Sequence, residues 1–183
     1  MINNQAAYQE YTSTYRELLQ LLSAFSQEQL NTVPFEGSWT AAQVGQHLLQ
    51  GTIADAVDGP GVPTQRAPDE KKAIIEGIFL DFTTKLQSPD FVLPEAKEYD
   101  KQNLLHAMEA TVSRTEKAIQ TQDLSMTYAE FDFPQVGPLT RLEWVCFGVA
   151  HAKRHIRQLR NIYEHVAESV KHKAQSIKHK AEG

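Results

Sequence analysis

The chain has 183 residues, of which 41% are hydrophobic and 22% are charged, and its formal net charge is −5. This length suits one domain, or one domain with a tail, that buries a core without cross-links. The negative charge argues against a general nucleic-acid binder, because such a surface needs excess lysine and arginine to neutralise phosphates.

The predicted cellular compartment follows from features that the sequence lacks. Cys146 is the single cysteine, so no disulfide can form within the chain, which is typical of a reducing cytosol. The first residues lack a basic start followed by an apolar run, and the sequence has no apolar stretch of 18 residues. We therefore predict a cytoplasmic protein with no membrane partner.

The first half of the chain predicts three helices. Apolar residues recur every three or four positions over 6–25, which indicates an amphipathic helix. A second helix is predicted to begin after Thr40, whose capping box is closed by Gln43, and to continue as far as the loop at 58–68. A third is expected over 69–87, because acidic residues at its start suit the helix dipole.

The second half predicts two more helices. Asp100 can cap a helix over 101–122, and a long helix runs from residue 139 or 140 to beyond Tyr163. Residues 127–133 alternate enough to be a short strand, but no partner strand is evident. We therefore predict an all-α fold, a four-helix bundle with short extra helical turns, as one domain over residues 1–165.

The last residues, 166–183, differ from the rest because they contain two basic near-repeats, SVKHKAQ and SIKHKAE. Their apolar residues follow the spacing of a coiled-coil seam, but two heptads are too short to be stable alone. We predict a helical or frayed tail, with packing against a second copy in a homodimer as the alternative. His172 and His179 are expected to be surface residues of this tail.

Two histidines four residues apart stand in the motif HAKRH, at His151 and His155. In a helix they share one face, with Cβ atoms roughly 6 Å apart, so both imidazoles can reach one ion. A site needs a third ligand, and His47 is the better candidate, because it lies on an otherwise small or apolar stripe where a charged imidazole is costly. His106 has a mixed setting and is expected to be a hydrogen-bonded or hydrated boundary residue.

A glycine accompanies the histidine on each of the two helical stripes. Gly51 follows His47 by four residues, and Gly148 precedes His151 by three. Because glycine inside a helix costs about 1 kcal/mol, we expect each glycine to leave room for a close helix contact or for a substrate.

Spacing alone leaves three hydrogen-bonded core histidines as an equal alternative to a metal site. The segments SWTAAQVGQHLLQ and WVCFGVAHAKRHIRQLRNI, however, resemble the DinB-like (YfiT-type) superfamily of metal-binding four-helix bundles. The resemblance covers about residues 5–163, and it implies that the metal ligands are His47, His151 and His155. The other matching positions are Trp39, Thr40, Arg154 and Gln158.

Three neutral imidazoles suit a divalent transition metal, with zinc and nickel favoured here, and leave a position open for another ligand. Ala152 follows His151, so the HExxH general base of the zinc peptidases is missing. No carboxylate lies on the histidine stripes; Glu143 and Asp55 are off that face. Gln158 can orient a ligand.

The two arginines near the motif have two interpretations. Arg154 and Arg157 either bind an anionic substrate or pair with surface acids. Cys146 is expected to be a small buried residue rather than a nucleophile.

These residues predict a metal-dependent enzyme with a small-molecule substrate, either a hydrolase or a thiol-dependent S-transferase. For the second reaction, the resemblance implies a low-molecular-weight thiol cosubstrate such as bacillithiol or mycothiol. The alternative is a non-catalytic metal-binding or structural bundle. A closed site favours the bundle, whereas an open position facing a cleft favours the enzyme.

Overall fold

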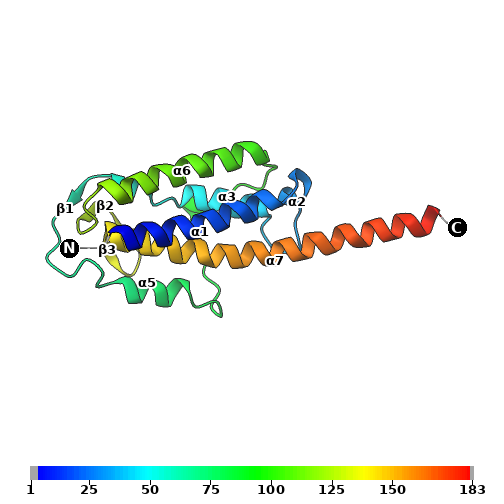
Figure 1. The fold of residues 1–183 in the computed structure, drawn as a ribbon. Helices are drawn as coiled ribbons and strands as arrows, with labels where there is room; N and C mark the ends of the chain where they lie inside the picture. The colour runs from blue at the N-terminus through cyan, green and yellow to red at the C-terminus, as the bar shows by residue number, and fades with distance from the viewer. Residues whose placement is uncertain (1–3, 182–183) are drawn as a thin grey trace.

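The computed structural model describes residues 4–181, with side chains described for residues 4–168. Four helices form a bundle, in which α1 packs against both α6 and α7, and α3 contacts the same two helices (Figure 1). These helices are α1 (Asn4–Ala24), α3 (Ala41–Gln50), α6 (Lys101–Thr121) and α7 (Arg141–Ala181). Short helical segments join them: α2 (Gln27–Asn31), α4 (Ala54–Asp58), α5 (Lys72–Phe79) and the 3-10 turn η1 (Asp90–Val92). The predicted four-helix bundle is confirmed.

The helix starts that were predicted from capping residues are also confirmed. The Thr40 hydroxyl accepts from the Gln43 N–H at 3.1 Å, and Gln43 Oε1 accepts from the Thr40 N–H at 3.0 Å, so the capping box is complete. At α6, the Asp100 carboxylate accepts from the Asn103 N–H at 2.8 Å. The cap at Thr40 fixes the phase of α3 and turns Val44 and His47 toward the core.

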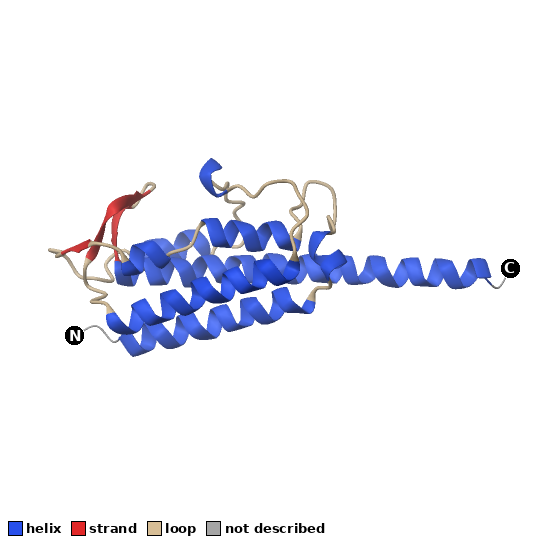
Figure 2. Cartoon of the chain, turned by 90° about the horizontal axis from the view of Figure 1, so that it is seen from above, coloured by secondary structure: helices blue, strands red, loops and turns tan. Residues whose placement is uncertain are grey.

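A small antiparallel sheet lies at one end of the bundle (Figure 2). Its strands are β1 (Gly61–Val62), β2 (Thr127–Phe133) and β3 (Gly137–Thr140), with β2 in the middle. The strand predicted over 127–133 therefore exists, but the expectation that it has no partner was wrong. The partners are two residues in a loop and four residues directly before α7, which are too short for alternation to reveal them.

The helix predicted from Thr40 to the loop at 58–68 is interrupted. It divides into α3 and α4, because α3 ends at Gln50 with Gly51 as its C-cap, and the Thr52 hydroxyl accepts from the Ala54 N–H at 3.2 Å. Ile53, between the two helices, packs against Gly148 of α7, where an added Cβ would lie 2.7 Å from Ile53 Cδ1. The break places the end of α3 and the start of α4 against α7.

The third predicted helix, over 69–87, was too long, because α5 covers only Lys72–Phe79. Its acidic start lies in a turn before α5 rather than in the helix. Beyond α5, the Asp81 carboxylate accepts from the backbone N–H of Thr83 at 3.0 Å and from the hydroxyls of Thr83 and Thr84. This local turn competes with helix continuation.

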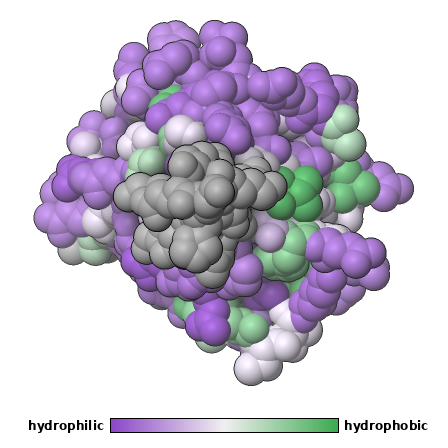
Figure 3. Space-filling model, turned by 90° about the vertical axis from the view of Figure 1, so that its right-hand side faces the viewer, coloured by the Kyte–Doolittle hydropathy of each residue, from purple (hydrophilic) through white to green (hydrophobic). Residues whose placement is uncertain are grey.

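Helix α7 continues past the other bundle helices and projects as a single helix (Figure 1). The basic tail is thus helical to Ala181, although His172 and His179 lie beyond the described side chains. The surface around the projecting helix is mainly hydrophilic, with a few hydrophobic side chains beside it (Figure 3). No helix in the described residues is long and apolar enough to cross a bilayer.

Removal of the tail after Glu168 is expected to leave the bundle folded. Val166, 2% exposed, is the last core residue among the side chains described, so truncation removes no known core contact. We expect the melting temperature to change by less than about 2 °C, as for a surface change well below 1 kcal/mol. Calorimetry and size-exclusion chromatography check this; a larger fall, or loss of a dimer, would show that the heptads pack against another surface.

Candidate metal centre

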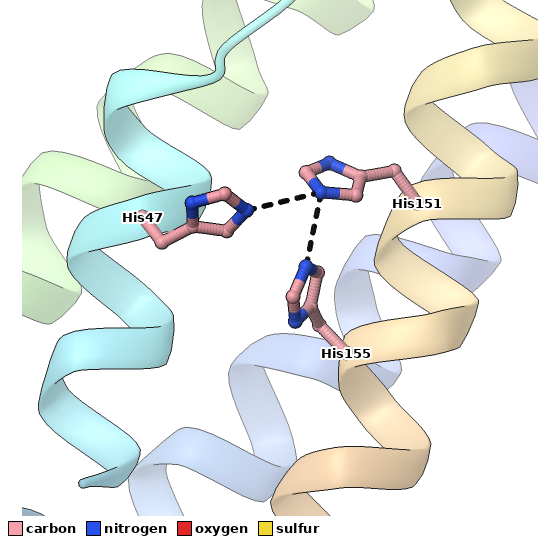
Figure 4. A group of neighbouring side chains, drawn as sticks. All are labelled: His47, His151 and His155. Atoms are coloured by element: carbon pink, nitrogen blue, oxygen red, sulfur yellow. Dashed lines mark hydrogen bonds between the residues drawn. The ribbon is translucent and has the colours of Figure 1, made fainter. Parts of the chain in front are cut away.

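The three histidines singled out in the sequence lie together in the structure (Figure 4). His47 projects from α3, and His151 and His155 project from successive turns of α7. The Nε2 atom of His151 lies 3.2 Å from Nε2 of His47 and 3.0 Å from Nε2 of His155. Exposure of the three residues is only 3%, 9% and 8%, so the cluster is buried.

Hydrogen bonds on the far side of two imidazoles set their orientation. His47 Nδ1–H donates to the Val92 carbonyl at 2.8 Å, and His155 Nδ1–H donates to Gln158 Oε1 at 2.8 Å. The contact of Gln158 with a site histidine is as predicted. Because both Nδ1 atoms carry the proton, both Nε2 atoms present lone pairs to His151.

This arrangement leaves the cluster with too few protons for its contacts. His151 Nε2–H can donate to only one of its two neighbours, so the Nε2 lone pair of the other neighbour receives no hydrogen bond from His151 in a buried site. A cation between the three nitrogen atoms can accept all three Nε2 lone pairs once His151 is protonated on Nδ1, whereas hydrogen bonds among the three imidazoles cannot satisfy them all. The donor count therefore favours ion binding over the alternative of satisfied core histidines.

The electrostatic environment keeps the imidazoles neutral. Burial lowers the pKa of His47, and burial together with the neighbouring His155 and His47 lowers the pKa of His151 well below its ordinary value. For His155, burial lowers the pKa to about 4. Neutral imidazole is the form that ligates metal ions, so all three are ready for ligation near pH 7.

The distances also suit a small divalent ion. One ligand atom from each of the three histidines lies within 4.8 Å of the others. Nitrogen ligands about 2.0–2.1 Å from a tetrahedral ion are about 3.3 Å from one another, close to the two shorter separations in the cluster. Three neutral nitrogen donors thus fit a divalent transition metal with room for a further ligand.

Two further histidines with described side chains, His106 and His165, lie away from this cluster. His106 is exposed on α6, as expected for a boundary residue. His165 is exposed on α7, ten residues beyond His155, and its Nδ1 lies 2.8 Å from the Asn161 carbonyl oxygen. Cys146 is half-buried, and burial raises the pKa of its thiol to about 11, which agrees with the prediction that it is not a nucleophile.

The nearby carboxylates have structural partners. Glu143 is fully buried and paired with Arg66 at 2.6 Å, and Asp55 is paired with Arg114 at 2.8 Å. Among the described residues, no carboxylate joins the three histidines within ligand distance of one another. The described carboxylates are therefore not part of the ligand group, although Asp55 lines the pocket beside it.

The two arginines make contacts that the sequence did not indicate, and their binding of an anionic substrate stays a prediction. Arg154 donates to the backbone carbonyls of Phe79, Asp81 (2.8 Å) and Thr84, so it fastens the segment after α5 to α7. The Arg157 guanidinium lies over the Phe82 ring, 5.0 Å from its centroid. Both side chains pack against the same segment instead of pairing with surface acids.

A pocket of about 610 Å³ opens onto the cluster, and all three histidines line it. Val92, Phe79 and Phe147 also line this pocket, and sequence reasoning had not selected them. Phe147 precedes His151 by four residues, so helical spacing could have identified it. Phe79 and Val92 come from segments that carry no such signal.

The two glycines have different roles. Gly51 lines the pocket, where an added Cβ would lie 3.8 Å from His151 Cε1, so it contributes to the open space. Gly148 instead allows the close contact with Ile53. Gly51 thus leaves room for a ligand and Gly148 leaves room for a close contact, which are the two roles predicted for these glycines.

Three comparisons place the chain among known proteins. A family model described as the DinB superfamily matches residues 10–159. Among solved structures the chain is similar to YfiT from Bacillus subtilis, described as a probable metal-dependent hydrolase with an unusual four-helix bundle topology. The two share 16% sequence identity with a TM-score of 0.58, over 91% of this chain and 90% of that chain, which supports the fold alone. A comparison with curated protein sequences gave no match.

Proposed function

The chain belongs to the DinB superfamily, and from this premise we propose that it is a metal-dependent enzyme acting on a small molecule. Its proposed ligands are His47, His151 and His155. The observation that carries the proposal is that the histidine cluster lines an open pocket of about 610 Å³, the volume of a small-molecule site. A non-catalytic or purely structural ion would instead favour a closed site.

A divalent ion on three neutral imidazoles supplies Lewis acidity, which lowers the pKa of a water molecule or thiol at its free position. The residues of the chain provide the setting for this chemistry. The Val92 carbonyl and Gln158 keep the ligand lone pairs directed at one point. Zinc and nickel both suit this ligand set, and the ligand types do not choose between them.

Two reactions suit the pocket. Hydrolysis of a small molecule is supported by the description of the similar YfiT structure. Transfer to a thiol is supported by a described ligand group without a carboxylate, because a thiol with a pKa of about 8.5 needs far less help to lose its proton than water at about 15.7. Both reactions place the nucleophile at the histidine cluster and the other reactant along the pocket wall.

A small thiol is expected to separate these reactions. If thiol transfer is the function, 2-mercaptoethanol at millimolar concentration should change the visible absorption of the cobalt-loaded protein. The change is expected because the thiol sulfur would become a ligand at the position that the three histidines leave open. Ethylene glycol, which has the same shape but no thiol, should leave the spectrum unchanged. Absorption titration of protein without a histidine tag provides the measurement.

The control is the His47→Ala protein, which should not respond to the thiol. An unchanged spectrum of the intact protein would remove thiol transfer and leave hydrolysis or a non-catalytic ion. Absence of stoichiometric metal in protein purified without a tag and supplied with zinc, nickel or cobalt would overturn the proposed function itself. The cytoplasmic location and the homodimer remain predictions.

A further inference from the structure

A continuous series of aromatic rings leads away from the histidine cluster along one wall of the pocket. The Phe147 ring stacks on the His151 imidazole, with 5.1 Å between centroids and 15° between planes. Phe79 meets both rings edge-on, at 4.9 Å from Phe147 and 5.7 Å from His151. Phe133 and Trp144 extend the series, at 4.9 Å and 5.7 Å from Phe147.

The mouth of the pocket is also aromatic. Phe91 of η1 and Phe131 of β2 come from different parts of the chain, yet their ring centroids are 6.2 Å apart. They are 67% and 39% exposed, and both line the pocket. Large apolar side chains gathered at the mouth of a pocket indicate contact with an apolar ligand.

Two charged side chains are part of the described pocket lining, and they differ in how their charge is balanced. Asp55 pairs with Arg114, and the Arg154 guanidinium donates to the carbonyls of Phe79 and Asp81. No other charged side chain is part of the described lining. The carbonyl groups do not neutralise Arg154, so a charged substituent on the ligand is tolerated near Arg154 or the histidine cluster, whereas the rest of the ligand meets a mostly apolar wall.

We infer that the pocket binds a small molecule with an aromatic or similarly flat apolar body, whose reacting group lies at the histidine cluster. This inference rests on the proposed function and names its substrate class. Rings favour offset-stacked and edge-on partners, which the wall from Phe147 to Trp144 provides. A ligand that is polar over its whole surface is disfavoured along this aromatic wall, because its polar groups would lose hydrogen bonds to water there.

Two hydroxamic acids that share one chelating group test the substrate class. We expect 2-naphthohydroxamic acid to change the absorption of the cobalt-loaded protein at a concentration at least tenfold lower than acetohydroxamic acid does. Equal affinities, after correction for their affinities toward cobalt in imidazole solution, would overturn the inference while leaving the metal centre intact.

Substitutions in the aromatic wall test whether its rings cause the preference for 2-naphthohydroxamic acid. Phe133→Ser should reduce the preference for the naphthyl acid to threefold or less, and Phe133→Leu should retain most of it. Phe131→Ser at the mouth serves if Phe133→Ser does not fold. Phe35→Ser is the matched control, because Phe35 is 44% exposed and lies outside the pocket lining. A similar loss in the Phe35 variant would contradict the inference.

The proposed function and this inference can fail separately. If neither hydroxamic acid changes the cobalt spectrum, the open metal position is wrong. Binding of uncharged 2-naphthol to the metal-free protein then decides the substrate class by calorimetry. Saturable binding that is lost in Phe133→Ser supports an aromatic ligand, and absence of binding overturns it.

Discussion

Replacement of His151 by alanine is expected to lower the metal content of the purified protein from about one ion per chain to a trace. The Nε2 atom of His151 is the middle member of the cluster, in contact with the Nε2 atoms of both His47 and His155. Its loss removes one of three ligands and separates the other two. The effect on affinity should exceed the roughly 10–100-fold that follows loss of an outer hydrogen-bond partner.

His47→Ala is expected to lose metal as fully as His151→Ala, because the three ligands act as one chelate. Metal analysis by mass spectrometry after gel filtration checks both variants, and circular dichroism checks that each is folded. His106→Ala is the control and should keep its metal, since His106 is exposed on α6. Stoichiometric metal in the His47 variant would show that the third ligand is wrong.

The parts of this site that depend on local structure could be predicted from sequence. Four-residue spacing placed His151 and His155 on one face of α7, and the capping box of Thr40 fixed the phase of α3. The approach of α3 to α7 depends on tertiary packing, so the addition of His47 relied on its apolar stripe and on the family resemblance. Spacing within one helix carries no information about a neighbouring helix.

The wall of the pocket could not be predicted because contacts between distant segments hold it in place. Residues 69–87 have a helical pattern, but the structure ends α5 at Phe79, where Arg154 of α7 binds the following carbonyl groups. At the other end of this wall, the Val92 carbonyl accepts from His47. Arg154 and His47 thus hold the two ends of the segment from Phe79 to Val92, whose sequence carries no signal of its place in the pocket wall.

The short strand β1 was missed for a related reason. It has two residues, lies in a loop rich in proline and glycine, and exists because β2 pairs with it at Thr127 and Tyr128. The hairpin of β2 and β3 closes through a turn in which Gln135 and Gly137 have positive φ angles of 65° and 79°. Pairing that depends on a partner strand leaves no periodic pattern in so short a segment.

Glu143→Gln is expected to lower the free energy of unfolding by about 2–4 kcal/mol, because breaking a buried ion pair leaves its partner without compensation. Glu143 is fully buried in the first turn of α7. Its two carboxylate oxygens accept from both terminal nitrogens of Arg66 at 2.6 Å, and from the backbone N–H groups of Lys71 and Thr140. One carboxylate therefore joins the loop before α5 to the start of the helix that carries two site histidines.

Thermal unfolding of the wild-type and Glu143→Gln proteins provides the measurement. The expected fall in melting temperature is about 5–12 °C for a chain of this size. Glu76→Gln is the matched control, because the Lys72–Glu76 pair is exposed and 3.7 Å long and should contribute less than about 0.5 kcal/mol. A fall as large in the Glu76 variant, or none in the Glu143 variant, would contradict the assigned role.

The pH dependence provides a second and independent check on the charge of Glu143. Burial alone raises the pKa of this carboxyl group, but the bonds from Arg66, Thr140 and Lys71 bring the pKa below its ordinary value. A lowered folded-state pKa contributes stability above the unfolded value of about 4.3, and that contribution is lost as pH falls through the folded-state pKa. The stability difference between wild type and Glu143→Gln should therefore be constant from pH 8 to about 5.5 and shrink below about pH 4. A difference that persists unchanged at pH 3 would mean that Glu143 acts through its shape and hydrogen bonds rather than through its charge.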